Sequence, residues 1–139
     1  MNPKHLLIIC GPTAVGKTAL SVTLAKHFGT EIISADSRQL YKEMSIGTAK
    51  PTVQEMQGVP HHFIDCISIQ QNYTAGDYEK EVIQKLDELS LDLNFDLSVL
   101  NSAIKNFDNE LEICHLVNII EGIYELSKEI RNIFYNSIY

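Results

Sequence analysis

Eight residues near the N-terminus carry the clearest chemical signal in the sequence. Residues 11–18 read GPTAVGKT and fit the pattern G-x-x-x-x-G-K-[ST]. In such a loop, backbone N–H groups surround phosphate oxygens, and the glycines let the backbone approach them closely. The lysine adds a mobile positive charge, and the following hydroxyl can ligate Mg²⁺. The motif predicts a polyphosphate site formed by Gly11, Pro12, Thr13, Ala14, Val15, Gly16, Lys17 and Thr18, with Thr18 as the metal ligand.

A second polar cluster, DSRQ at residues 36–39, follows the next apolar run. Open α/β sheets place ligands at the carboxyl ends of their strands, so we expect Asp36 to face the same crevice as the phosphate loop. A carboxylate there can hold Mg²⁺ through water or accept a proton from an attacking nucleophile. The structural alternative is that Asp36 or Ser37 caps the segment that follows.

The elements that must position these motifs can be predicted from the hydrophobic pattern. The apolar runs at 6–10 and 31–35 are typical of buried strands, and residues 17–28 form a helical stripe with Gly29 at the C-cap position. The order strand, loop, helix, strand predicts a βαβ unit with a parallel sheet. Further along, the pattern predicts a helical turn at 54–57, a strand at 62–67 and an amphipathic helix at 75–90.

The character of the chain changes after residue 90. Residues 91–99 alternate apolar and polar side chains as a strand does, and helical periods then run through 97–108 and 111–135. Residues 1–90 hold 8 Lys+Arg against 10 Asp+Glu, a balance of −2, whereas residues 91–139 hold 3 against 8, a balance of −5. We therefore predict two parts: a core at 1–90 and an acidic, mostly helical tail at 91–139.

Composition excludes several classes of protein. With 45% hydrophobic and 21% charged residues, the chain resembles an ordinary globular protein, and no apolar run is long enough to span a membrane. Three widely spaced cysteines predict neither a disulfide framework nor a zinc site, so a reducing cytoplasm is the expected location. The net charge of −7 does not indicate a nucleic-acid binder. His61 and His62 are adjacent in a predicted strand, so we expect them on opposite faces, in structural roles.

Four motifs in this order resemble the bacterial tRNA dimethylallyltransferases over about residues 5–90: GPTAVGKT, EIISADSRQLY, IGTAKP at 46–51 and PHHFID at 60–65. The resemblance implies transfer of a dimethylallyl group from dimethylallyl diphosphate to N6 of an adenine beside the tRNA anticodon. The phosphate loop would then hold the diphosphate with Mg²⁺, through Thr13, Gly16, Lys17 and Thr18. By position, Asp36 matches the general base, and Ser37, Arg38 and Gln39 lie in the segment that holds the adenine.

The sequence also departs from that family. The family's GG-[ST]-GLY motif is absent, and no basic cluster follows Lys85. We therefore expect a truncated, P-loop NTPase-like parallel sheet with flanking helices, a mainly helical tail, and weak or no transfer activity. The alternatives are a prenyltransferase acting on free adenine nucleotide, a small kinase using ATP, and a non-catalytic helical fragment. A kinase lid would need arginines, and the chain has only Arg38 and Arg131. We expect a monomer, with self-association through 111–135 as the alternative.

Overall fold

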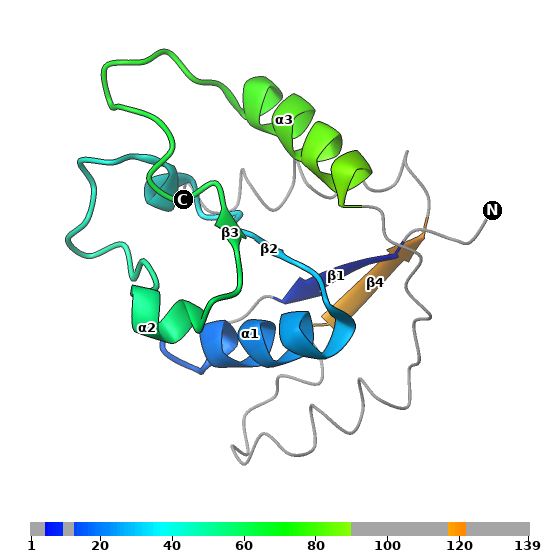
Figure 1. Cartoon of the computed structure of the whole chain (residues 1–139). Coiled ribbons are helices and arrows are strands. Elements are labelled where there is room, and N and C mark those ends of the chain that lie inside the picture. Colours follow the sequence, from blue (N-terminus) through cyan, green and yellow to red (C-terminus); the bar gives the residue numbers. More distant parts are fainter. Residues whose placement is uncertain (1–4, 10–12, 90–116, 122–139) are drawn as a thin grey trace.

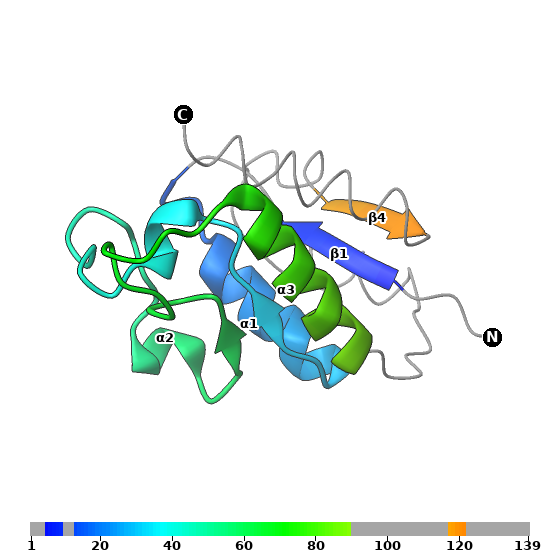
Figure 2. The same ribbon diagram turned by 90° about the horizontal axis from the view of Figure 1, so that it is seen from above.

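The protein places helices on both sides of short strands. A computed structural model describes residues 5–9, 13–89 and 117–121. Helices α1 (Lys17–Phe28) and α3 (Ala75–Glu88) lie on opposite sides of strand β2 (Ile32–Ile33), as the two perpendicular views show (Figures 1 and 2). The predicted α/β class is therefore confirmed at the level of a small parallel sheet flanked by helices.

Helix α1 has the bounds that the sequence predicts. It ends at Gly29, which has a φ of 63° and donates its N–H to the Ala25 carbonyl. Glycine adopts this left-handed conformation without the steric penalty that a Cβ brings, which makes it a good helix terminator. The buried side chains of the helix are Leu20, Val22, Leu24 and Ala25.

A parallel pair of strands forms the centre of the fold. Strand β2 pairs with β3 (His61–His62), with Ile32 opposite His61 and Ile33 opposite His62. A bridge between Tyr41 and Ile67 continues the parallel direction. The strand predicted at 62–67 is therefore present but shorter, and it begins one residue earlier.

The first strand is not in the parallel sheet that the sequence predicted for it. Strand β1 (His5–Ile9) pairs antiparallel with β4 (Val117–Glu121) in a sheet separate from that of β2, whereas the sequence predicted both strands in one parallel sheet. The helix predicted across 111–135 is therefore wrong at 117–121. Three of these five residues are Val or Ile, which favour strands, and β1 has an open edge whose backbone groups need partners. The predicted elements at 91–99, at 97–108 and in the rest of 111–135 lie outside the described residues.

Two apolar clusters fill the layers on either side of β2. Ile32 packs on the α1 side against Val22, Ala25 and Val59. Ile33 packs on the α3 side against a cluster made of Leu40, Ile67, Tyr78 and Val82. Successive strand residues point to opposite faces, so this two-residue strand contributes to both layers.

The remaining helices begin with side-chain caps. In α2 (Val53–Met56), Thr52 and Glu55 form a capping box, and in α3 the same role falls to Thr74 and Asp77. The predicted turn at 54–57 and helix at 75–90 are confirmed with small shifts of their ends. Among the described residues, no helix is both long and apolar enough to cross a membrane.

Candidate functional site

The turn before α1 has the backbone shape that a phosphate loop needs. Ala14 has a φ of 67° and Gly16 a φ of 93°, so two of the four residues at 13–16 are left-handed. Alternating backbone conformations of this kind turn successive N–H groups towards one side, which makes an anion-binding concavity. Gly11 and Pro12, which complete the predicted motif, lie outside the described residues.

The N-terminus of α1 is built differently from those of the other two α-helices. Its N-cap is Gly16, which has no side chain to accept from the first N–H groups, and no acidic residue lies in its first turn. In α2 and α3 a threonine and an acidic residue fill these positions. A helix start without such partners keeps its N–H groups and its partial positive charge for an external anion.

Lys17 and Thr18 begin this helix and are both partly buried. The predicted roles need both side chains at the anion site, the lysine as a charge and the threonine as a metal ligand. Mg²⁺ is commonly held by few protein ligands together with phosphate oxygens. Among the described residues no cluster of three or more His, Cys, Asp or Glu could hold a metal alone.

Asp36 lies at the end of the strand that follows α1. Figures 1 and 2 place the start of α1 and the turn after β2 at the same end of the molecule. Asp36 caps the 3-10 helix Ser37–Leu40 by accepting the Arg38 N–H at 2.9 Å. The capping role considered in the sequence analysis is thus present, and it occurs where the sequence also predicts the crevice.

The Asp36 carboxylate is also paired with the guanidinium of Arg38. Arg38 Nε donates to Oδ1 at 3.2 Å, and Nη2 donates to Oδ2 at 3.0 Å. The two side chains are 27% and 53% exposed, so this is a solvent-accessible pair that is easily exchanged for another partner. The carboxylate raises the pKa of Arg38 through this hydrogen bond and its charge.

Gln39 has a different place from the one expected of an adenine contact. Its amide nitrogen donates to the carbonyls of Thr48 at 3.0 Å and Ala49 at 3.1 Å. Its amide oxygen accepts from the Ser34 hydroxyl at 2.8 Å. Both amide hydrogens are therefore used within the protein, and the side chain ties the end of β2 to the loop at 48–49. The neighbouring Ser37 is buried.

Long-range contacts that the sequence analysis missed hold the Asp36 segment from two sides. Tyr78 of α3 is 1% exposed and donates its hydroxyl to the Ser34 carbonyl at 2.8 Å, and its burial raises the pKa of the phenol. Lys50 donates to the Tyr41 carbonyl at 2.6 Å and to Asp65 at 2.5 Å. The only sequence signal for Lys50 is its position in the GTAKP motif, because its partners lie nine and fifteen residues away.

The histidine pair behaves as the strand alternation predicts. His61 Nδ1 lies 2.9 Å from the Val59 carbonyl, whereas His62 Nε2 contacts the carboxylate of Glu31. The two rings therefore have separate partners. Neither contact involves the phosphate turn or Asp36, which supports the structural role.

The described residues thus define an α/β protein in which a glycine-led turn before α1 and the carboxylate of Asp36 lie at one end of the molecule. A family model described as IPP transferase matches residues 39–94. The tRNA dimethylallyltransferase of Cytophaga hutchinsonii is 57% identical over 88 residues, which cover 63% of this chain and 29% of that protein. The tRNA dimethylallyltransferase of Flavobacterium johnsoniae is 49% identical over 116 residues, which cover 79% of this chain and 38% of that protein. The N-terminal part of the chain therefore matches the IPP transferase family, in agreement with the resemblance read from its motifs.

A solved structure agrees with the sequence relatives. The tRNA delta(2)-isopentenylpyrophosphate transferase of Staphylococcus epidermidis superposes with a TM-score of 0.56 at 45% identity. The match covers 59% of this chain and 27% of that one. The chain thus spans well under half the length of these relatives.

Proposed function

We propose that this chain carries the site for dimethylallyl transfer from dimethylallyl diphosphate to N6 of the adenine beside the tRNA anticodon. The observation that supports the proposal most is the uncapped, glycine-led start of α1 at the same end of the molecule as Asp36. The relatives that match this part of the chain are named for that transfer.

The phosphate side would hold the leaving group. Backbone N–H groups within residues 11–18, all except Pro12, would surround the diphosphate in a P-loop type of fold, with Lys17 adding a full positive charge. Mg²⁺, held by Thr18 and diphosphate oxygens, would neutralise further charge on the leaving group. Because these groups are in place before the reaction, they favour the state in which charge builds up on the departing oxygen.

The Asp36 side would act on the acceptor. The adenine N6 attacks the allylic carbon, the bond from that carbon to oxygen breaks, and diphosphate leaves with the electron pair. The N6 proton passes to Asp36, which must first exchange its contact with Arg38 for the adenine amine. Ser37, Arg38 and Gln39 would shape the adenine side, with Gln39 acting through the loop at 48–49.

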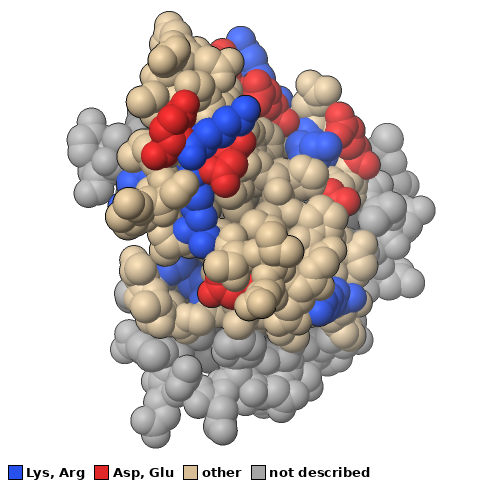
Figure 3. All heavy atoms as spheres, turned by 60° about the vertical axis from the view of Figure 1, so that its left-hand side comes forward, with Lys and Arg blue, Asp and Glu red and all other residues tan. Residues whose placement is uncertain are grey.

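The other partners follow from this assignment. On the face drawn in Figure 3, the lysine and arginine side chains of the described residues are interspersed with aspartate and glutamate, so these residues form no continuous basic patch for RNA there. Phosphate contacts dominate affinity for nucleic acids, so we expect weak binding of tRNA and slow transfer by this chain alone. We propose a monomer that acts on cytoplasmic tRNA.

The test is transfer of labelled dimethylallyl groups to an unmodified anticodon stem-loop in the presence of Mg²⁺. We expect slow incorporation by the chain, and loss of incorporation in both Lys17→Ala and Asp36→Ala. Incorporation that persists in either variant would contradict the assignment. A folded chain that neither incorporates label nor binds dimethylallyl diphosphate would refute the proposed function.

A further inference from the structure

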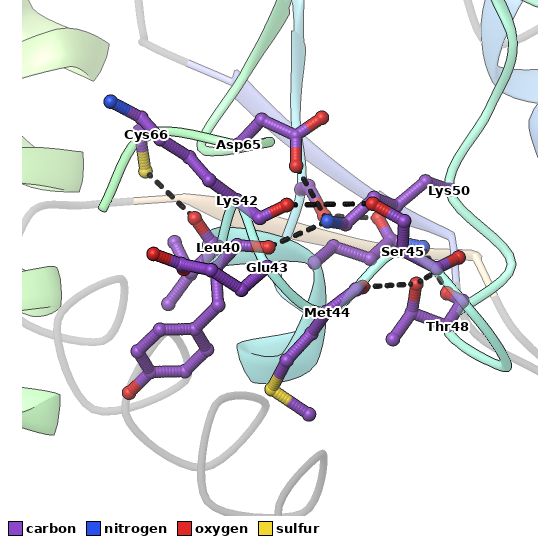
Figure 4. A network of polar contacts seen from close by, with 12 residues as sticks. Leu40, Lys42, Glu43, Met44, Ser45, Thr48, Lys50, Asp65 and Cys66 are labelled. Atoms are coloured by element: carbon purple, nitrogen blue, oxygen red, sulfur yellow. Dashed lines mark hydrogen bonds and ion pairs between the residues drawn. The ribbon is translucent and has the colours of Figure 1, made fainter. Parts of the chain in front are cut away.

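Lys50 is an unusual lysine for this chain because its ammonium is withdrawn from solvent. The side chain is only 10% exposed, and the carboxylate of Asp65 with which it pairs is 52% exposed. Burying an ammonium is costly unless hydrogen bonds and an opposite charge compensate for it. The Lys50 ammonium has both, from the Tyr41 carbonyl and from Asp65 (Figure 4).

The two contacts of Lys50 join three segments of the chain. The first segment is the loop after Gly47, which Lys50 ends. The second is the 3-10 helix that Asp36 begins, because Tyr41 is its C-cap. The third contains Asp65 and leads to the parallel bridge at Ile67. The ammonium lies where these segments meet. Lys50 therefore contacts the segment Asp36–Tyr41 at the end opposite Asp36.

Backbone hydrogen bonds join the same segments and run beside the ammonium. The N–H of Asp65 donates to the Gln39 carbonyl at 2.9 Å, and that of Cys66 donates to the Leu40 carbonyl at 2.9 Å. In the opposite direction, the N–H of Lys42 donates to the Ile67 carbonyl at 2.9 Å. Asp65 has a φ of 51°, a conformation that non-glycine residues rarely adopt and that surrounding contacts must maintain.

We propose that Lys50 is a positioning residue for the transfer reaction, acting through the Asp36–Tyr41 segment. The inference rests on the proposed function and extends it to a residue that contacts neither substrate. Asp36 caps the start of the 3-10 helix and Lys50 holds its end, so the ammonium fixes where the carboxylate stands relative to the bound diphosphate. Small displacements of reacting groups have large effects on rate, about a hundredfold for 1 Å.

Lys50→Met tests this directly because it removes the ammonium and keeps a long apolar side chain. The matched control is Lys26→Met, since Lys26 is an exposed lysine of α1 that donates to Gln57 Oε1 at 2.7 Å, away from the Asp36 segment. Asp65→Asn is the second comparison, because it removes the negative charge but leaves an oxygen acceptor and the Tyr41 contact.

Two measurements separate positioning from general support of the fold. Steady-state transfer should show kcat lowered about tenfold or more in Lys50→Met, with KM for dimethylallyl diphosphate within about twofold of wild type. Hydrogen exchange should show faster exchange at the amides of Lys42, Asp65 and Cys66, with the amides of α1 unchanged. Lys26→Met should change neither, and Asp65→Asn should change kcat less than Lys50→Met does.

Each outcome decides the inference. Equal losses of protection in α1 and at the three amides, or a rise in KM matching the fall in kcat, would mean that Lys50 only supports the fold, which overturns it. No change in exchange would overturn it as well. If the folded wild-type chain neither transfers label nor binds dimethylallyl diphosphate, the proposed function fails, and with it the role of Lys50 in transfer. Local loss of protection in Lys50→Met would then show only that Lys50 fixes the Asp36 segment.

Discussion

The turn at residues 13–16 and the segment Asp36–Tyr41 lie at the same end of the molecule, yet they are held in place by different means. The turn takes its shape from its own backbone, with left-handed residues at Ala14 and Gly16 and an uncapped helix behind it. The Asp36 segment is held by contacts with distant parts of the chain. Lys50 donates to the Tyr41 carbonyl, the Gln39 side chain donates to the Ala49 carbonyl, and Tyr78 donates to the Ser34 carbonyl just before the segment. A turn that binds phosphate can be shaped by its own backbone, whereas a segment that must place one carboxylate needs contacts with distant parts of the chain.

The largest effect that we expect comes from Tyr78, which supports the Asp36 segment from α3. Tyr78→Ala should lower the free energy of unfolding by about 3–5 kcal/mol, because it removes a buried aromatic ring that also contacts Phe63 edge-on. Tyr78→Phe keeps the ring and loses only the bond to Ser34, so it should cost about 1 kcal/mol. Chemical denaturation measures both. Equal losses in the two variants would show that the hydroxyl, not the ring, provides the support.

Gln39 gives the next largest effect. Gln39→Met removes three hydrogen bonds between the end of β2 and the loop at 48–49, and we expect a loss of about 2 kcal/mol of unfolding free energy. Gln84→Met on the exposed face of α3 is the control and should change stability by less than about 0.5 kcal/mol. A Gln39 variant as stable as this control would mean that the loop needs no support from the amide.

Gly29, at the C-terminal end of α1, gives a smaller effect. It tests whether the turn before α1 depends only on its own backbone geometry. Gly29→Ala places a Cβ on a residue with a φ of 63°, where no atom lies within 4 Å, so the cost is strain alone, about 1 kcal/mol. Gly76→Ala in α3 meets only ordinary contact and should be neutral or slightly stabilising. Thermal denaturation compares the two. Diphosphate affinity should be the same in both variants, and a loss confined to Gly29→Ala would show that the far end of α1 also shapes the turn.

The smallest effect concerns the capping box of α3. Hydrogen bonds from Thr74 lower the pKa of Asp77 below its usual value. A lowered pKa in the folded state means that the ionised carboxylate stabilises the protein above its unfolded pKa, and that this contribution is lost as the pH falls through the folded pKa. The stability difference between wild type and Asp77→Asn should therefore shrink below about pH 4. A difference that stays constant down to acid denaturation would contradict this.

The same contrast explains what the sequence can predict. The bounds of α1 follow from GKT at its start and Gly29 at its end, which are local signals. The partner of β1 could not be predicted, because the apolar spacing in residues 111–135 fits a helix while its Val and Ile content at 117–121 favours a strand. The contacts of Gln39 with the loop at 48–49 and both contacts of Lys50 join residues nine or more positions apart, and no local pattern specifies such pairs.

The measurement that tests the account most directly is the affinity of the chain for dimethylallyl diphosphate, by calorimetry with Mg²⁺, in wild type, Lys17→Ala and Asp36→Asn. We assign the diphosphate to the turn before α1 and the acceptor adenine to the Asp36 segment. Lys17→Ala should therefore weaken binding by about tenfold or more, the equivalent of a charge-assisted hydrogen bond. Asp36→Asn should bind within about twofold of wild type. Equal weakening in both variants, or weakening only in Asp36→Asn, would contradict the division of the site into these two parts.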